Sequence, residues 1–236
     1  MIGFVFGGER GLYYRLSGRD NLRYFAELYR VAPRRIKARV GELLEIVGLR
    51  DRADERVEGY SRGMKQRLHL ARMLLHDPEI LFLDEPTIGL DPVGARELRE
   101  IIRQLHEQRK TILLTTHYMF EADALCQRIA VLSKGRLAAL GTPAELKAFV
   151  RDLSVVELEV FGATPEIIER LRALDFVDSV VVEQRDLRQV LRVQTPIAER
   201  AVQRLLASLG ELDVGRVGVR EATLEDAYVR LVGKAE

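Results

Sequence analysis

Residues 80–92 read ILFLDEPTIGLDP, and this stretch decides the fold. Ile80 to Leu83 form a short apolar run, which predicts a buried strand of a parallel sheet. The run ends in two adjacent carboxylates, Asp84 and Glu85, which need an electrostatic or catalytic reason to lie at the edge of a core. An aspartate at such a strand end can hold Mg²⁺ in a phosphate-transfer site, and a second carboxylate can polarise the attacking water.

Segments on either side of this strand carry related chemistry. Residues 59–66 read GYSRGMKQ and open a leucine-rich helix that we predict over about residues 64–75. Ser61 supplies a hydroxyl there, and a helix start supplies N–H donors that suit a phosphate. Residues 112–116 read ILLTT and predict a second apolar strand, with His117 at its end.

In this order, these motifs resemble those of the ATP-binding cassette ATPases of membrane transporters. The matching segments are Ser61-Arg62-Gly63-Met64-Lys65-Gln66 for the signature loop, Leu83-Asp84-Glu85-Pro86 for Walker B, Gly89-Leu90-Asp91-Pro92 for the D-loop and Thr115-Thr116-His117 for the switch histidine. The resemblance covers residues 1 to about 150. The remainder is similar to the tail of exporter cassettes that serve drug or antibiotic efflux.

The expected fold class is α/β, with two domains. The resemblance implies that residues 1–150 form a P-loop NTPase-like cassette core, N-terminally incomplete, with a helical subdomain. Residues 17–49 look helical, with Ser17 as the cap of one helix and Pro33 at the start of another. Their helical spacing predicts core positions at Leu22, Phe25, Leu28, Leu43, Leu44 and Val47. From about residue 151 the pattern becomes β-α-β-β-α-β, which predicts a small ferredoxin-like α+β domain over 151–236. We expect no nucleotide-binding residue in this second domain.

The resemblance also implies cofactors and roles, with ATP and Mg²⁺ as the cofactors. Asp84 would hold the Mg²⁺, Glu85 would orient or deprotonate the attacking water, and His117 would contact the γ-phosphate. The loop residues Ser61, Arg62, Gly63 and Met64 would bind ATP held by an opposite subunit, and Asp91 would couple the two sites. The implied partners are transmembrane permease subunits and a second ATPase subunit, identical or not, at the cytoplasmic face of the membrane.

Two cassette motifs depart from the family pattern. A phosphate-binding loop requires Gly-x-x-x-x-Gly-Lys-Ser/Thr, and residues 1–236 contain no such string. The chain therefore looks like a cassette without its first portion. Gly7 stands where the glutamine of the Q-loop is expected, which leaves a metal contact there open. Membrane coupling could still use Arg10, Leu12 and Tyr13.

Composition excludes several other classes of protein. The net charge is +1 although 31% of residues are charged, so there is no basic bias that would indicate nucleic-acid binding. The single cysteine, Cys126, cannot form an intrachain disulfide, and we expect it to be a packing residue. The four histidines lack the spacing of a transition-metal site.

Two alternatives to a working exporter ATPase stay open at this point. The chain could be a non-catalytic partner that only donates its signature loop to an intact ATPase. It could also be a truncated gene product, or one whose start is mis-assigned. An in-frame phosphate loop upstream of Met1 in the coding sequence would favour truncation.

Overall fold

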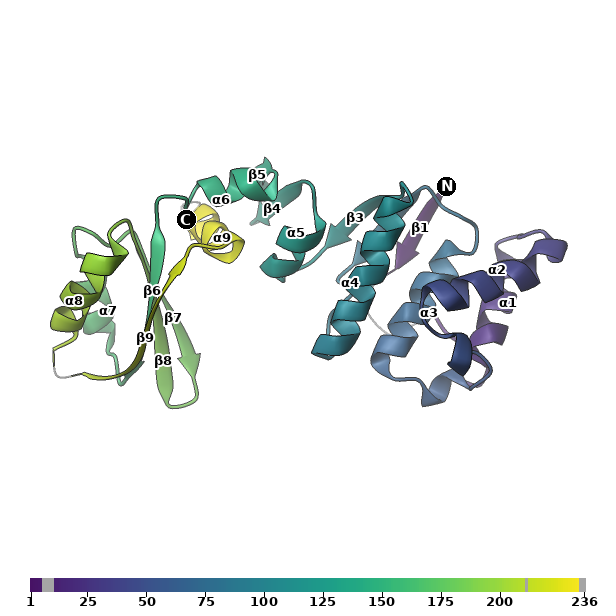
Figure 1. The fold of residues 1–236 in the computed structure, drawn as a ribbon, viewed down its shortest axis with the longest axis horizontal. Helices are drawn as coiled ribbons and strands as arrows, with labels where there is room; N and C mark the ends of the chain where they lie inside the picture. Colours follow the sequence, from purple (N-terminus) through teal and green to yellow (C-terminus); the bar gives the residue numbers. More distant parts are fainter. Residues whose placement is uncertain (6–10, 211, 234–236) are drawn as a thin grey trace. The chain divides into compact units, whose positions relative to one another are not determined.

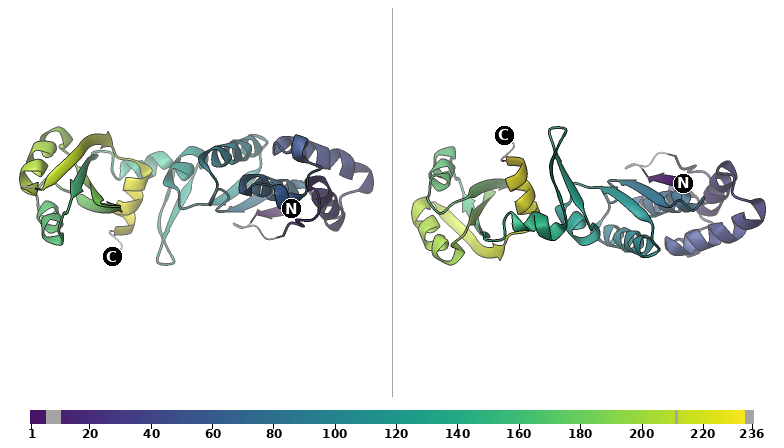
Figure 2. Two further views of the ribbon diagram at one scale, coloured as in Figure 1. Left: turned by 90° about the horizontal axis from the view of Figure 1, so that it is seen from below. Right: turned by 90° about the horizontal axis from the view of Figure 1, so that it is seen from above.

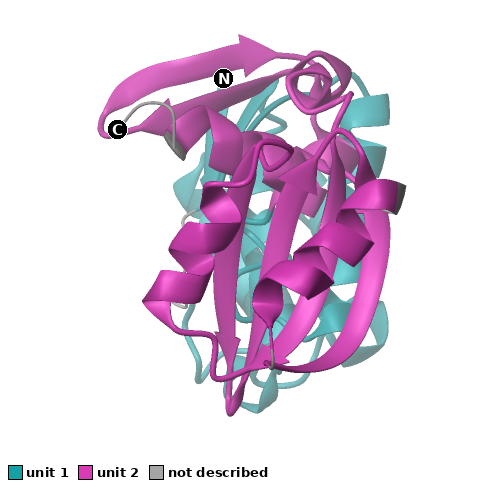
Figure 3. Cartoon of the chain, turned by 90° about the vertical axis from the view of Figure 1, so that its left-hand side faces the viewer, with its two compact units in different colours: residues 1–118 teal, residues 119–236 magenta. Residues whose placement is uncertain are grey.

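The computed structural model describes residues 1–5, 11–210 and 212–233, and they divide into two compact units, 1–118 and 119–236 (Figures 1 and 3). The first unit contains β1 (Ile2–Val5), α1 (Gly18–Leu28), α2 (Pro33–Ile46), two 3₁₀ turns (Arg50–Arg52 and Val57–Gly59), α3 (Arg62–Leu74), β2 (Ile80–Asp84), α4 (Pro92–Glu107) and β3 (Thr111–Thr115). The predicted strands at 80–83 and 112–116 and the helix after Ser61 are all present.

A parallel sheet in the order β1-β2-β3 organises the first unit. Leu81 and Leu83 are buried on one face. The chain approaches closely on this side, because a Cβ at Gly3 would overlap Met73 of α3 and lie 2.9 Å from Pro78. Phe4 and Phe82 stack on the other face with ring centroids 4.7 Å apart.

This second face of the sheet is largely open among the described residues. Phe4 is 49% exposed and Leu113 is 55% exposed. Parallel strands are normally covered on both faces. The described residues therefore leave an apolar sheet surface that a further layer can cover.

Helices α1 and α2 form the predicted helical part of this unit. Ser17 caps α1 by accepting a hydrogen bond from the Asp20 N–H, and Pro33 occupies the first turn of α2, both as predicted. Leu22, Phe25, Leu43, Leu44 and Val47 are buried, as predicted for core residues. Leu28, which the same helical spacing places in the core, is 59% exposed, so this prediction was wrong.

The second unit contains a two-stranded hairpin and a four-stranded sheet; the hairpin can be followed in Figure 2. Its elements are α5 (Met119–Leu125), β4 (Ile129–Ser133), β5 (Arg136–Gly141), α6 (Pro143–Ala148), β6 (Ser154–Phe161), α7 (Pro165–Arg172), β7 (Ser179–Arg185), β8 (Arg188–Thr195), α8 (Ala198–Leu209), β9 (Asp213–Glu221) and α9 (Leu224–Gly233). The antiparallel order β7-β8-β6-β9, with α7 and α8 packed on one core, confirms the predicted ferredoxin-like pattern.

Helix α9 joins the two parts of this unit. Leu224 is buried in a cluster with Ala122, Val131 and Leu146, and the partly buried Cys126 packs against that cluster. On the sheet side, Asp226 accepts hydrogen bonds from Arg220. The boundary between the two compact units lies between residues 118 and 119 of the chain. The predicted domains, 1–150 and 151–236, divide the chain by its motifs and stay a prediction.

Among the described residues, no helix has both the length and the apolar character needed to cross a bilayer. Nor do His, Cys, Asp and Glu side chains in that part of the chain gather in groups of three or more that could hold a metal ion.

The junction before β6 leads to a prediction about proteolysis. Arg151 and Asp152 are exposed, so limited trypsin treatment should cut after Arg151. The two fragments should stay associated, because Arg230 bonds both the Phe149 carbonyl at 2.6 Å and Asp178 at 2.9 Å. Native size-exclusion chromatography after cleavage measures this. Fragments that separate without denaturant, or a junction that resists cleavage, would contradict the prediction.

His69 on α3 should make stability depend on pH. It is 3% exposed with its Nε2 unpartnered, and burial, followed by the charge of Arg72, lowers its pKa from 6.5 to about 4. The unfolded chain therefore binds a proton, between these pH values, that the folded chain excludes. The neutral His69 therefore contributes to the free energy of unfolding fully above about pH 6.5. As the pH falls towards 4, the free energy of unfolding decreases by on the order of 3 kcal/mol.

Replacing His69 by Leu should flatten the fall in melting temperature between pH 6.5 and 4. The exposed His106 on α4 gives the control, since His106→Gln should keep the wild-type slope. An unchanged slope in His69→Leu would show that His69 is not the titrating group.

Candidate functional site

The carboxyl ends of β2 and β3 bring the predicted acidic residues next to Thr115. Register pairs Asp84 with Thr115, and the Thr115 hydroxyl donates a short hydrogen bond to Oδ1 of Asp84. The backbone N–H of Glu85 donates to both the carbonyl and the hydroxyl oxygen of Thr115, each at 3.1 Å. Thr115 therefore fixes the side chain of one carboxylate and the backbone of the other.

Glu85 adopts an unusual backbone conformation at this edge. Its φ is +42°, in the left-handed region that side chains disfavour, and it precedes Pro86. Such strain persists where the surroundings over-determine the conformation, and it clusters at functional sites. Its Oε1 lies 3.2 Å from Nδ1 of His117. The structure thus brings Asp84, Glu85 and His117 together, and both partners of the last pair are part-exposed.

The predicted signature loop forms the start of α3. Ser61 is the N-cap, and its hydroxyl accepts a hydrogen bond from the Met64 N–H at 3.2 Å. Ser61 and Arg62 are exposed, and the helix start carries the positive end of the helix dipole. Arg62 and Gly63 are the first residues of the helix, so this surface suits a phosphate group.

Asp91 begins α4 in the same manner. Its Oδ1 accepts hydrogen bonds from the N–H groups of Val93 and Gly94, both at 3.0 Å. These bonds, with that from Gly94 the larger, lower the pKa of Asp91. Its carboxylate is exposed and already serves as a helix cap.

The predicted site residues thus fall into two groups in the first unit. Asp84, Glu85 and His117 form the strand-end group, whereas Ser61 to Met64 and Asp91 lie at helix starts. Within the described residues, no hydrogen bond or ion pair links one group to the other. Gly7 and Arg10 of the predicted Q-loop lie outside the described residues.

Asp84 fits a Mg²⁺ ligand by donor type and exposure. Its carboxylate is exposed at the strand end and makes no ion pair with a lysine or arginine of the described part of the chain. Oxygen ligands from one carboxylate and from phosphate are the usual way in which proteins bind Mg²⁺.

Thr115 is the positioning residue that sequence reasoning did not assign. It appeared only as a flank of His117, and its role depends on the register between two strands far apart in sequence. Only an explicit alignment of the two apolar runs as parallel neighbours could have found it.

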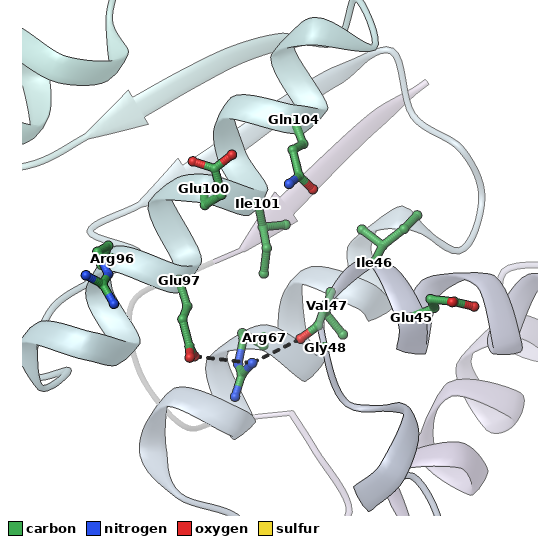
Figure 4. A pocket seen from close by; sticks show the side chains of 10 residues that line it. All are labelled: Glu45, Ile46, Val47, Gly48, Arg67, Arg96, Glu97, Glu100, Ile101 and Gln104. Carbon is green, nitrogen blue, oxygen red and sulfur yellow. Dashed lines mark hydrogen bonds and ion pairs between the residues drawn. The ribbon is translucent and has the colours of Figure 1, made fainter.

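A groove in the first unit lies apart from these residues. It has a volume of about 640 Å³ and runs between the end of α2, Arg67 of α3 and residues 96–104 of α4 (Figure 4). Arg67 donates to the Val47 carbonyl at 3.3 Å and pairs with Glu97 at 3.4 Å. None of the predicted site residues lines it.

Comparisons with known proteins show the family to which this chain belongs. A family model described as "ABC transporter" matches residues 2–88. The linearmycin resistance ATP-binding protein LnrL of Bacillus subtilis is 32% identical over 228 residues, covering 96% of this chain and 73% of that protein. A fluoroquinolones export ATP-binding protein of Mycobacterium tuberculosis is 52% identical over 222 residues, covering 94% of this chain and 65% of that protein.

The ABC transporter ATP-binding protein NatA of Bacillus subtilis is 44% identical over 140 residues, covering 59% of this chain and 57% of that protein. The chain thus spans 57% to 73% of the length of these three relatives. Among solved structures, CbiO1 from Clostridium perfringens, part of the ABC transporter complex CbiONQ, matches with a TM-score of 0.58 and 30% identity. That match covers 62% of this chain and 59% of CbiO1. The predicted cassette fold class is confirmed.

Proposed function

Because the chain belongs to the ATP-binding proteins of ABC transporters, we propose that it is the ATPase subunit of an exporter that drives transport by ATP-dependent dimer closure. The observation that carries the proposal is the strand-end group, in which Thr115 holds Asp84 and Glu85 and His117 contacts Glu85. The drug-resistance and drug-export names of the relatives support export.

Each residue of the strand-end group has a role that its geometry supports. Asp84 would hold Mg²⁺ beside the phosphates, where the ion neutralises developing negative charge. Glu85, oriented through its backbone, would accept a proton from the attacking water. His117, within hydrogen-bonding distance of Glu85, would orient that carboxylate and contact the terminal phosphate.

The helix-start group, Ser61 to Met64 with Asp91, would act on a nucleotide held by a second ATPase subunit, identical or not. Ser61 and the N–H groups of Arg62 and Gly63 present donors at the exposed start of α3, and the Met64 N–H is already used by the Ser61 cap. The carboxylate of Asp91 lies at the start of the neighbouring helix α4, where it would couple the two sites. In this arrangement the strand-end group would bind the cation and the helix start would bind the phosphate.

An exposed aromatic surface would dock the transmembrane permease subunits. Tyr13 and Tyr24 contact edge to face with ring centroids 4.9 Å apart, and they are 48% and 44% exposed. Leu28, which lies on α1 with Tyr24, is 59% exposed. Leu12, which the sequence analysis also named for membrane coupling, is buried and so is not part of this exposed surface.

The open face of the β1-β2-β3 sheet would take the layer that carries a phosphate loop. The relatives extend beyond the matched region, and a parallel sheet needs cover on both faces. Phe4, Phe82 and Leu113 supply the apolar contact surface for such a layer.

A second candidate function is that of a non-catalytic partner. The observation that favours it is the exposed start of α3, where Ser61 and Arg62 are accessible. Such a partner would present Ser61 to Met64 to the ATP of an intact ATPase. The test is ATP hydrolysis by a mixture of this chain and an intact cassette ATPase. Hydrolysis that appears in the mixture and is lost when this chain carries Ser61→Ala would distinguish the partner role from that of a self-sufficient enzyme.

The catalytic proposal predicts the effect of Glu85→Gln in a chimera that places a relative's phosphate loop and its layer before residue 2. Turnover should fall by roughly 10²–10⁴-fold, because the general base is lost, while ATP binding is kept. Steady-state hydrolysis and nucleotide titration measure the two effects. Glu107→Gln, at the exposed end of α4, is the control. Hydrolysis within about tenfold of the parent chimera would refute the role of Glu85.

Residues 1–236 alone should bind Mg·ATP weakly and hydrolyse it negligibly. A triphosphate needs a lysine and several backbone N–H groups around its oxygens, whereas Asp84 and Glu85 repel it. Isothermal titration calorimetry of the purified chain measures this affinity. A micromolar dissociation constant would contradict our interpretation of the site.

A further inference from the structure

The signature loop and the D-loop of this chain touch each other at glycines. A Cβ at Gly63, in the first turn of α3, would lie 3.9 Å from the Cα of Gly94, in the first turn of α4. A Cβ at Gly89 would overlap the guanidinium of Arg62 and lie 2.7 Å from its Nη2. The two helix starts are therefore close neighbours, and Arg62 fills the space beside Gly89.

The guanidinium of Arg62 occupies the space that a side chain at position 89 would need. Gly89 has a φ of +68°, which glycine adopts readily, and its missing side chain leaves the backbone open to the guanidinium. Arg62 makes no ion pair with any residue that the structure describes. Its guanidinium group thus lies beside Gly89 of the D-loop, and a lysine, whose ammonium lacks this planar group, would not fill the same space.

The D-loop connects this contact to the strand-end group. The Ile88 N–H donates to the Glu85 carbonyl at 3.1 Å, and the Leu90 N–H donates to the Thr87 carbonyl at 3.1 Å. Gly89 lies within the second of these overlapping turns, and Asp91 follows them as the cap of α4. A shift of Gly89 would therefore pull on the backbone of Glu85, whose φ of +42° is already strained.

We propose that Arg62 is a positioning residue that clamps the D-loop to the signature loop and so links the two nucleotide sites within one chain. The clamp itself is a property of the described chain, and its part in the reaction rests on the proposed function. The signature loop would contact the ATP of the second subunit, and Glu85 would act on the ATP in this chain's own site. A movement of the signature loop is passed by the clamp to the D-loop and from there to Glu85.

Hydrogen–deuterium exchange on residues 1–236 tests the clamp without nucleotide. In Arg62→Ala the amides of residues 88–90 should exchange about fivefold faster, because a local contact that restrains the turn is lost. Arg62→Lys should behave like Arg62→Ala. Arg96→Ala, an exposed arginine near the start of α4, is the matched control and should leave these amides unchanged.

The melting temperature and the exchange of the central strands separate positioning from a general structural role. Both should stay at wild-type values in Arg62→Ala, since Arg62 is exposed. Unchanged exchange at residues 88–90, or an equal increase throughout the first unit, would overturn the proposal.

A double-mutant cycle identifies Gly89 as the partner of Arg62. Gly89→Ala introduces backbone strain and displaces the guanidinium, whereas in the Arg62→Ala background only the strain remains. Gly89→Ala should therefore raise exchange at residues 88–90 less in the Arg62→Ala background than in wild type. Additive effects would exclude direct coupling.

The ATP-hydrolysing chimera described above tests the part played in the reaction. Arg62→Ala should lower kcat about tenfold with little change in KM, because misplacing a catalytic group affects the chemical step more than binding. An unchanged kcat would overturn the link to Glu85. If the parent chimera does not hydrolyse ATP, the proposed function fails, while the exchange experiment still decides whether the clamp exists.

Discussion

The parallel register of β2 against β3 is the constraint on which the candidate site depends. It places Thr115 opposite Asp84, so that one threonine bonds the carboxylate of Asp84 and the backbone of Glu85. Sliding β3 by one residue would turn Thr115 to the other face and remove both contacts. The apolar runs of the two strands, whose inward side chains fit one core face, set this register. The chemistry at the sheet edge therefore depends on the packing of leucines that take no part in it.

Much of this arrangement could be predicted from the sequence because its signals are local. An apolar run followed by carboxylates predicted β2, a serine before a helical pattern predicted the cap of α3, and alternating segments predicted the ferredoxin-like sheet. What could not be predicted depends on contacts between distant segments. The bonds of Thr115, the packing of α9 with Ala122 and Leu146, and the position of Arg62 beside Gly89 leave no local pattern. The exposure of Leu28 shows that helical spacing alone does not establish which positions are covered.

The open face of the sheet links stability to the proposed function. Phe4 and Phe82 stack on each other, which reduces their contact with water, but Phe4 and Leu113 stay about half exposed. At roughly 25 cal/mol per Å² of apolar surface, covering such a face favours any layer that fits it. In the proposed function, the phosphate loop of this layer would lie near the carboxyl ends of β2 and β3, where Asp84 and Glu85 are found. One packing event would then stabilise the sheet and complete the site.

The signs of charge in the two groups of residues fit the proposal that the chain works with a second ATPase subunit. Asp84 and Glu85 form an acidic sheet edge that suits a cation, while the N–H groups and the positive dipole end at the start of α3 suit an anion. Mg·ATP carries both signs, so in the proposed function it would bridge the acidic edge of one subunit and the helix start of another. Within one chain these surfaces share no hydrogen bond or ion pair among the described residues, and the D-loop is the segment that runs between them. A contact that restrains the D-loop therefore affects both surfaces. This is why Arg62, which lies beside Gly89 and takes no part in proton transfer, can influence the reaction.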